Sequence, residues 1–148
     1  MHDLIYTMRF TGWAEPAGTD GNVLHAITLA PGCMLTSRVT VGGLEGALES
    51  QNGEDARFTS DVTFTGETSF LENGTITFGE GNTLTFSTVG RGYLAPSTDP
   101  ARKHGMVMWR VDHGEGQFAG ATGLITSNFF VDAQLGVVDH HLGVLLLP

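Results

Sequence analysis

Three consecutive residues near the C-terminus, Asp139-His140-His141, have the side-chain types that acid–base chemistry requires. Successive side chains of an extended strand point to opposite faces, so Asp139 and His141 share one face and His140 points to the other. A carboxylate beside an imidazole holds its tautomer and raises its basicity, as a general base requires. The sequence therefore predicts His141 as the acid–base group and Asp139 as the group that orients it. At a solvated strand end the same residues would be inert, and this alternative stays open.

Large apolar side chains elsewhere in the C-terminal half are candidates for the walls of a substrate-binding site. Trp109 offers an aromatic wall, and Met108 or Phe130 would form the opposite side, depending on which strand face points inward. Such polarisable side chains suit an apolar pocket, although they suit any protein core equally well. The predicted ligand is therefore a hydrophobic small molecule.

Tyr93 is a further candidate, because it lies where a strand meets a long polar segment, 94–105. This segment contains Pro96 and Pro100 and shows no apolar periodicity, so it is predicted to be the longest loop and the rim or lid of a cavity. A tyrosine at that position would donate a hydrogen bond at the cavity mouth, and we include it among the catalytic candidates.

The chain contains six histidines, which raise the alternative of a metal site. No His-x-His pair occurs, and the adjacent His140 and His141 diverge on a strand. A site would therefore need His25, His113 and one of those two to converge inside a barrel. We expect no metal and no other cofactor, and a His-metal barrel enzyme is the least favoured alternative.

The clearest structural signal is the alternation of apolar and polar residues in 56–70. Phe58, Val62, Phe64 and Phe70 occupy even positions, whereas the odd positions are charged or hydroxylated. A period of two predicts a strand rather than a helix, with the even face inward.

Short strands and turns account for most of the remaining sequence. Asn73-Gly74 is the preferred pair for a type I′ hairpin turn, Gly79–Asn82 is a second turn, and Asn52-Gly53 offers another hairpin. Gly42–Glu49 is the one segment expected to form a short helix. Further strands are expected at 4–10, 23–29, 34–41, 75–78, 83–86, 107–113, 124–131 and 137–147.

The last two of these strands carry apolar residues on both faces, which is typical of strands covered on both sides. A lumen would cover one face and a second subunit the other. We therefore expect a homodimer or homotrimer, with Phe129, Val131 and Val144 as contact candidates. Some nine or ten strands without crossover helices are compatible with two folds, a β-sandwich and a β-barrel. The strands that are apolar on both faces favour an all-β, antiparallel up-and-down barrel of about 8–10 strands.

A glycine-rich run, Gly114–Gly123, precedes the strand at 124–131. It does not match a dinucleotide fingerprint, because the spacing is GxGxxxG and a strand rather than a helix follows, so a bend between strands is the expected structure. Together with the apolar strand 137–147, the run resembles the allene oxide cyclase and dirigent superfamily across roughly 107–147. The resemblance implies a barrel of this size, often dimeric or trimeric, with an apolar lumen that binds or cyclises hydrophobic small molecules. No catalytic residue of that superfamily aligns with the N-terminal half.

Composition narrows the remaining possibilities. The 148 residues correspond to one domain, 1–148, and the scarcity of helix-forming runs argues against a helical bundle. A net charge of −9, from 16 acidic and 7 basic side chains, disfavours a nucleic-acid partner. No signal peptide or membrane-spanning segment is visible in the sequence, so a cytoplasmic location and no membrane partner are expected. We predict a cofactor-free isomerase or cyclase acting on a hydrophobic molecule in the lumen, with a non-catalytic carrier as the alternative.

Overall fold

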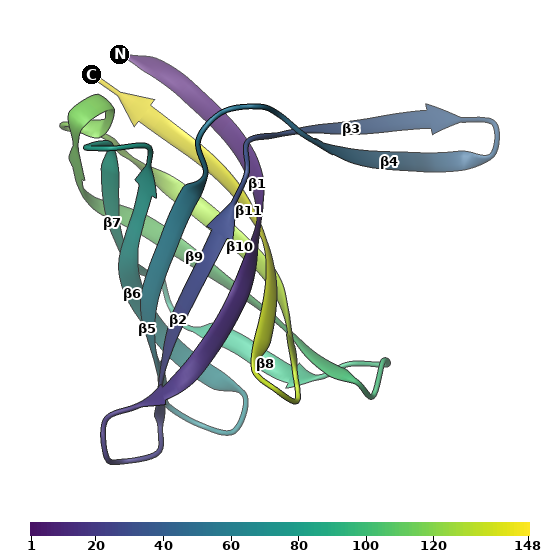
Figure 1. The fold of residues 1–148 in the computed structure, drawn as a ribbon, viewed down its shortest axis with the longest axis vertical. Helices are drawn as coiled ribbons and strands as arrows, with labels where there is room; N and C mark the ends of the chain where they lie inside the picture. Colours follow the sequence, from purple (N-terminus) through teal and green to yellow (C-terminus); the bar gives the residue numbers. More distant parts are fainter.

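The computed structural model describes residues 1–148 and consists almost entirely of β-strands (Figure 1). Eight strands form a closed antiparallel barrel in the order β1-β2-β5-β6-β7-β9-β10-β11, and β11 pairs back with β1. The barrel strands are β1 (His2–Ala17), β2 (Val23–Ala30), β5 (Ala56–Phe64), β6 (Ser69–Phe78), β7 (Thr83–Thr88), β9 (Arg102–Glu115), β10 (Thr122–Asp132) and β11 (Gly136–Leu147). The predicted up-and-down barrel is confirmed.

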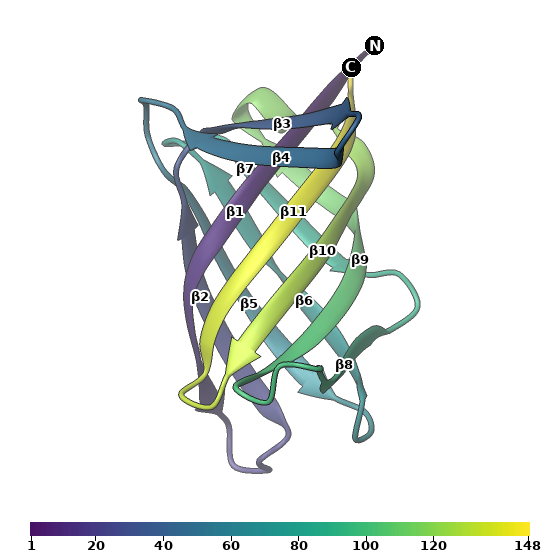
Figure 2. The same cartoon turned by 90° about the vertical axis from the view of Figure 1, so that its right-hand side faces the viewer.

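Three strands lie outside this eight-stranded order. The short β8 (Gly92–Pro96) pairs with the ends of β6 and β9. The hairpin of β3 (Cys33–Thr40) and β4 (Gly43–Ser50) forms a separate two-stranded sheet that projects from the barrel (Figure 2). The only helical segment is a single 3-10 turn at Gly116–Phe118, and no helix has the length and apolar character needed to cross a membrane.

The even positions of β5 and Phe70 of β6 point into the barrel, as the alternation predicts, but the single strand predicted over 56–70 is interrupted by a turn at 65–68. Phe58 is 2% exposed, and Phe70 is also buried. The Phe58 ring stacks on Phe86 at a centroid distance of 5.4 Å, and Phe86 lies 4.5 Å from Trp109. These aromatic contacts fill the middle of the barrel and separate one end from the other.

Two predicted turns are wrong. The chain reverses at 65–68, whereas Asn73-Gly74 lies inside β6. A Cβ at Gly74 would collide with the Thr59 carbonyl of β5, so this glycine permits close strand packing and does not form a turn. Asn52-Gly53 is not a hairpin either, because β4 does not pair with β5. The turn at Gly79–Asn82 is confirmed, with positive φ at Gly79 and Gly81.

The expected short helix at 42–49 is also wrong, since this segment forms β4. Cross-strand pairing with β3 is satisfied along the whole segment, from Gly43 opposite Thr40 to Ser50 opposite Cys33. Gly43 has a φ of 115°, which suits the tight reversal before the strand better than a helical turn.

The glycine-rich run closes one end of the barrel. Gly116, the first residue of the 3-10 turn, and Gly120, two residues after its end, adopt positive φ, which bends the chain from β9 into β10. Phe118, in that turn, is 3% exposed and packs against Phe78 at a centroid distance of 5.3 Å. The run is therefore a structural corner, as expected, and its phenylalanine plugs the end that holds both chain termini (Figure 1).

Candidate functional site

The opposite end of the barrel opens into a cavity of about 520 Å³. This volume is within the range of small-molecule sites, which is roughly 300–1,000 Å³. Fourteen of its 24 lining residues are hydrophobic, so a bound molecule would be held mainly by apolar contact. Phe64, Phe70 and Phe129 supply aromatic walls, with Phe70 between the other two at centroid distances of 6.2 and 5.9 Å.

The mouth of the cavity is formed by part of the segment 94–105, which was predicted to be a rim or lid. Residues 96–103, except Thr98, line the cavity, together with Leu94. The unpaired part is shorter than predicted, because β8 and β9 pair on either side of 97–101. Ser97 Oγ lies 2.7 Å from the Arg102 carbonyl oxygen, to which it donates, and Arg102 Nε donates to Asp99 Oδ2 at 2.9 Å. The hydrogen bond donated by the Ala101 backbone N–H lowers the pKa of Asp99, and the neighbouring Arg102 lowers it further. The rim is therefore a hydrogen-bonded turn.

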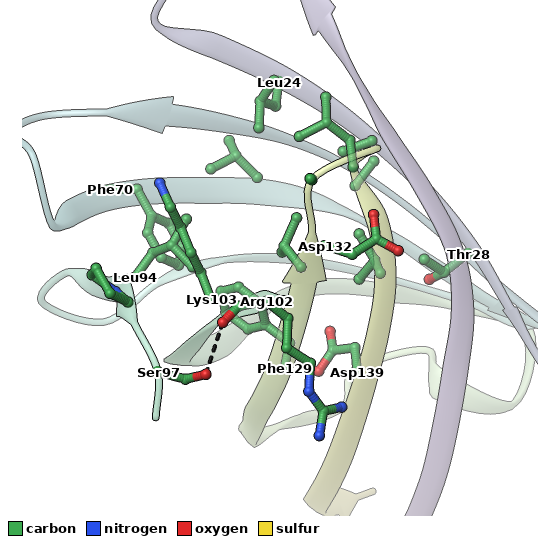
Figure 3. A pocket seen from close by; sticks show the side chains of 18 of the residues that line it. Leu24, Thr28, Phe70, Leu94, Ser97, Arg102, Lys103, Phe129, Asp132 and Asp139 are labelled. Carbon is green, nitrogen blue, oxygen red and sulfur yellow. Dashed lines mark hydrogen bonds between the residues drawn. The ribbon is translucent and has the colours of Figure 1, made fainter. Parts of the chain in front are cut away.

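Two acidic side chains lie in the apolar interior. One is Asp139, on the inward face of β11 (Figure 3). Ser127 Oγ donates to Asp139 Oδ1 at 2.6 Å, and His141 Nε2 donates to Oδ2 at 2.8 Å. Asp139 lines the cavity, whereas the His141 side chain is 0% exposed and lies deeper. The predicted shared face and coupling of this pair are thus present, but the carboxylate and not the imidazole meets the cavity.

The His141 ring is held by aromatic neighbours on three sides. Its centroid lies 4.3 Å from that of Phe10, 5.1 Å from Trp109 and 5.3 Å from Phe58. Its Nδ1 atom is buried without a hydrogen-bond partner. In this packing Nε2 points at Asp139.

The second acidic side chain is Glu72 on β6, which the sequence analysis missed. Glu72 lines the cavity, and Ser60 Oγ donates to its Oε1 at 2.6 Å. Burial raises the pKa of Glu72 to about 8, and the charge of Asp139 adds to the rise, whereas the Ser60 hydrogen bond and the neighbouring Trp109 oppose it. At pH 7 Glu72 is therefore mostly protonated. Its hydroxyl is then a proton donor beside the cavity, within electrostatic range of Asp139.

Two further buried side chains, Tyr6 and Thr28, have hydroxyl groups without hydrogen-bond partners. The Tyr6 hydroxyl is buried and unpartnered, and burial, followed by the charge of Asp139, raises its pKa above the usual tyrosine range. A Cβ at Gly143 would collide with the Tyr6 ring, so this glycine makes room for the tyrosine inside the barrel. Thr28 Oγ1 is likewise unpartnered, and Thr28 lines the cavity.

The remaining predicted site residues are not brought to the cavity. Trp109 points inward but lies below the cavity, fully buried in the aromatic core. Met108 and Phe130 point outward, because strand alternation places their neighbours inside, and the Arg102 guanidinium covers the Phe130 ring at 3.9 Å. Tyr93 is 46% exposed and faces His104 outside the cavity. The roles proposed for these four residues are not supported by their positions.

Two of the three predicted subunit contacts are also internal. Phe129 and Val131 lie on the inward face of β10 and line the cavity, so they cannot meet a neighbouring molecule. Val144 lies on the outer face and is 44% exposed. Both faces of β10 and β11 are apolar, as predicted, but the inner face lines the core and the cavity.

The histidines do not converge as the metal alternative requires. His25 pairs with Asp61 at 2.9 Å at the surface, and His113 lies beside Glu115 at 3.8 Å, whereas His141 is enclosed in the core. No three His, Cys, Asp or Glu side chains form a group that could hold a metal ion. A site built from these three histidines is therefore excluded by their positions.

Two solved structures have a similar fold, and both are described as pterocarpan synthase dirigent proteins. GePTS1 matches with a TM-score of 0.53 and 14% identity, covering 99% of this chain and 89% of its own. PsPTS1 matches with a TM-score of 0.55 and 14% identity, covering 99% of this chain and 95% of its own. At this identity the likeness establishes the fold, and the allene oxide cyclase part of the resemblance stays a prediction. No protein-family model and no curated protein matches the sequence.

Proposed function

We propose that this protein binds an apolar small molecule in the open end of its barrel and isomerises or cyclises it by proton transfer, without a cofactor. The observation that carries the proposal is the pair of buried acidic side chains, Asp139 and Glu72, in a cavity lined mainly by hydrophobic residues. Burying carboxyl groups is costly unless their surroundings compensate for lost hydration. Both are held by serine hydroxyl groups from neighbouring strands, Ser127 and Ser60.

The environments of the two carboxyl groups support different roles. Asp139 accepts hydrogen bonds from Ser127 and His141, which fix its carboxyl group at the cavity surface, and we assign it the role of the proton acceptor. Glu72 has a pKa of about 8 and is a proton donor at neutral pH. Two carboxyl groups in different surroundings can divide the acid and base roles of one site. His141 is a positioning residue in this proposal, which reverses the roles expected from the sequence.

The proposed step conserves atoms and electrons. Asp139 removes a proton from a C–H or O–H group of the bound molecule, the electron pair moves within that molecule, and Glu72 delivers a proton at another atom. The product is an isomer, so no oxidant, reductant or second substrate is required. The proton gained by Asp139 then returns to Glu72 by exchange with solvent after release. The aromatic walls would hold a reactive conformer, and orientation of this kind can lower a barrier by several kcal/mol.

A non-catalytic carrier is the second candidate, and the predominantly apolar lining favours it. The two functions differ in what the acidic pair does. In a carrier, Asp139 and Glu72 would bind polar groups of the ligand and leave its structure unchanged.

The experiment that separates the two compares ligands released from variants purified from the producing cells. Molecules extracted from the wild type, Asp139→Asn and Glu72→Gln are separated by chromatography, with Asp61→Asn as a surface control because Asp61 is 57% exposed. The proposal expects Asp139→Asn to retain a compound that fresh wild-type protein converts to one of equal mass and different retention. The Asp61→Asn variant should convert it at the wild-type rate. Release of one unchanged compound from all four proteins would contradict catalysis and support the carrier.

A further inference from the structure

The hairpin of β3 and β4, here called the arm, is amphipathic. Its register places the cross-strand pairs Leu35–Leu48 and Val39–Leu44 on one face. The opposite face carries Thr36 and the ion pair between Arg38 and Glu45, with Met34 opposite Glu49 near the base of the arm. Val39 and Leu44 are 83% and 75% exposed, so the apolar face has no cover within its own chain.

An arm of this kind needs a surface to pack on. A two-stranded hairpin alone is at best marginally stable in water, and the arm pairs with no third strand. Its strands contain eight residues each, too many for a simple turn between barrel strands. The arm therefore presents an ordered apolar face whose stability requires a partner.

A second uncovered apolar surface lies on the outer side of the barrel, across β1, β11 and β10. In the register of these strands, Ile5 lies opposite Val144, and Val144 lies opposite Leu124. With Leu142 and Leu146 of β11 these residues form what we call the outer stripe. Every member is at least 37% exposed, and Ile5 is 67% exposed. The inner side of the same strands is already occupied by the core and the cavity.

The arm and the outer stripe adjoin. The arm is anchored where Cys33 Sγ donates to the Thr7 carbonyl oxygen of β1 at 3.1 Å. Cys33 shares an arm face with Leu35, because they are two residues apart on a strand. Figure 1 shows the arm leaving the barrel on the side of β1, β11 and β10, and Figure 2 shows it crossing in front of β1 and β11. Two apolar surfaces thus meet at an angle.

We propose that a second copy of this chain covers both surfaces, with the apolar face of each arm packed on the outer stripe of the other barrel. In a two-fold symmetric dimer the arm of each chain covers the outer stripe of the other. Both apolar surfaces of both chains are then buried, because an isologous interface uses the same patches on each subunit. Any other partner would have to match an arm and a barrel face independently. The proposal does not depend on what the cavity binds or whether it catalyses a reaction.

The available area supports a dimer only if both surfaces take part. Two strands of eight residues, at about 3.3 Å per residue and about 4.8 Å between strands, give each arm a mean plane of about 250 Å². The outer stripe spans three strands over about five residues and gives a similar area. Either surface alone is the size of a non-specific contact, whereas both together approach the roughly 600 Å² per partner at which specific interfaces begin.

The test is the molar mass in solution, measured by sedimentation equilibrium at micromolar concentration. The wild type should have twice its chain mass of 15.7 kDa. Val39→Asp on the arm and Val144→Asp on the outer stripe should each have the mass of one chain. Thr36→Asp, on the polar face of the arm, is the matched control and should remain a dimer. Val39 lies outside the barrel, so near-ultraviolet circular dichroism of Val39→Asp should equal that of the wild type.

Hydrogen exchange links the two surfaces directly. In the proposed dimer, Val144→Asp removes the surface on which the partner's arm rests, so amides of 35–48 should exchange at least about tenfold faster although the substitution lies in β11. A monomeric wild type would overturn the proposal. An oligomer whose mass is unchanged by Val39→Asp, or one that contains other than two chains, would overturn it as well.

Discussion

Replacing Glu72 by glutamine should make the folded protein more stable at neutral and alkaline pH. Glu72 is buried, and its pKa is raised from 4.5 to about 8 in the folded protein. The folded state therefore holds the Glu72 proton over a pH range in which the unfolded state has released it. The stability linked to this proton is fully present below pH 4.5 and is lost as the pH rises through 8. Glutamine keeps a similar shape and removes the titration.

The expected magnitude follows from the two pKa values. One pKa unit corresponds to about 1.4 kcal/mol, so the full shift corresponds to a loss of about 5 kcal/mol. Between pH 5 and pH 8 the wild type should lose about 3 to 4 kcal/mol of unfolding free energy through Glu72. Glu72→Gln should not show this part of the decline, since its amide does not ionise. The difference between the two proteins isolates Glu72 from the other titrating groups.

The assay is urea unfolding of both proteins, followed by tryptophan fluorescence, at several pH values from 4.5 to 9. The stability of Glu72→Gln relative to the wild type should increase steadily up to about pH 8 and then level off. A matched control is Glu67→Gln, in the exposed turn between β5 and β6, which should follow the wild type. Parallel curves for the wild type and Glu72→Gln would refute the protonated buried glutamate and, with it, its role as a proton donor.

Three other substitutions test the packing around the site. Phe58→Ala should cost about 3–5 kcal/mol in urea unfolding, because Phe58 is 2% exposed and packs on Phe86 and Trp109 at the inner end of the cavity, whereas Phe64→Ala should cost less than half as much because Phe64 is only half-buried in the cavity wall. Equal costs would contradict the assigned cavity wall. His141→Phe should cost about 3–5 kcal/mol, because it leaves Asp139 buried without its imidazole partner. The double variant with Asp139→Asn should recover much of that loss, and additive costs would contradict the coupling. Gly143→Ala should cost about 1–3 kcal/mol through the clash with Tyr6, and an unchanged midpoint of thermal unfolding would argue against the crowding.

The sequence was sufficient to predict the barrel because alternation reports which strand face is buried. Phe58 and Phe70 lie on either side of the turn at 65–68, and both have even numbers and point inward. The inward face could therefore be assigned although the turn was predicted in the wrong place. Glu72 also has an even number and points inward. It was missed because Asn73-Gly74 was interpreted as a turn. Continuing the alternation through residue 72 would have identified a carboxyl group inside the barrel.

The periodicity of the sequence could not predict which residues form the walls and the mouth of the cavity. Alternation alone could not decide whether Trp109 or Met108 pointed inward, since both are apolar. Tyr93 was expected at the mouth, but the short strand β8 turns its side chain outward. The arm has the alternation of an ordinary hairpin, and its projection from the barrel follows from where the chain leaves β2 and returns to β5.

Binding of a small molecule in the open end of the barrel can be measured by titration with an apolar fluorophore whose emission rises on leaving water. Three proteins are compared: the wild type, Ala26→Phe, which fills part of the cavity, and Leu124→Phe, which changes the outer stripe. We predict one saturable site per chain in the wild type and in Leu124→Phe, and its loss in Ala26→Phe. Equal binding by all three proteins, or no saturable binding by the wild type, would contradict a small-molecule site in the open end of the barrel.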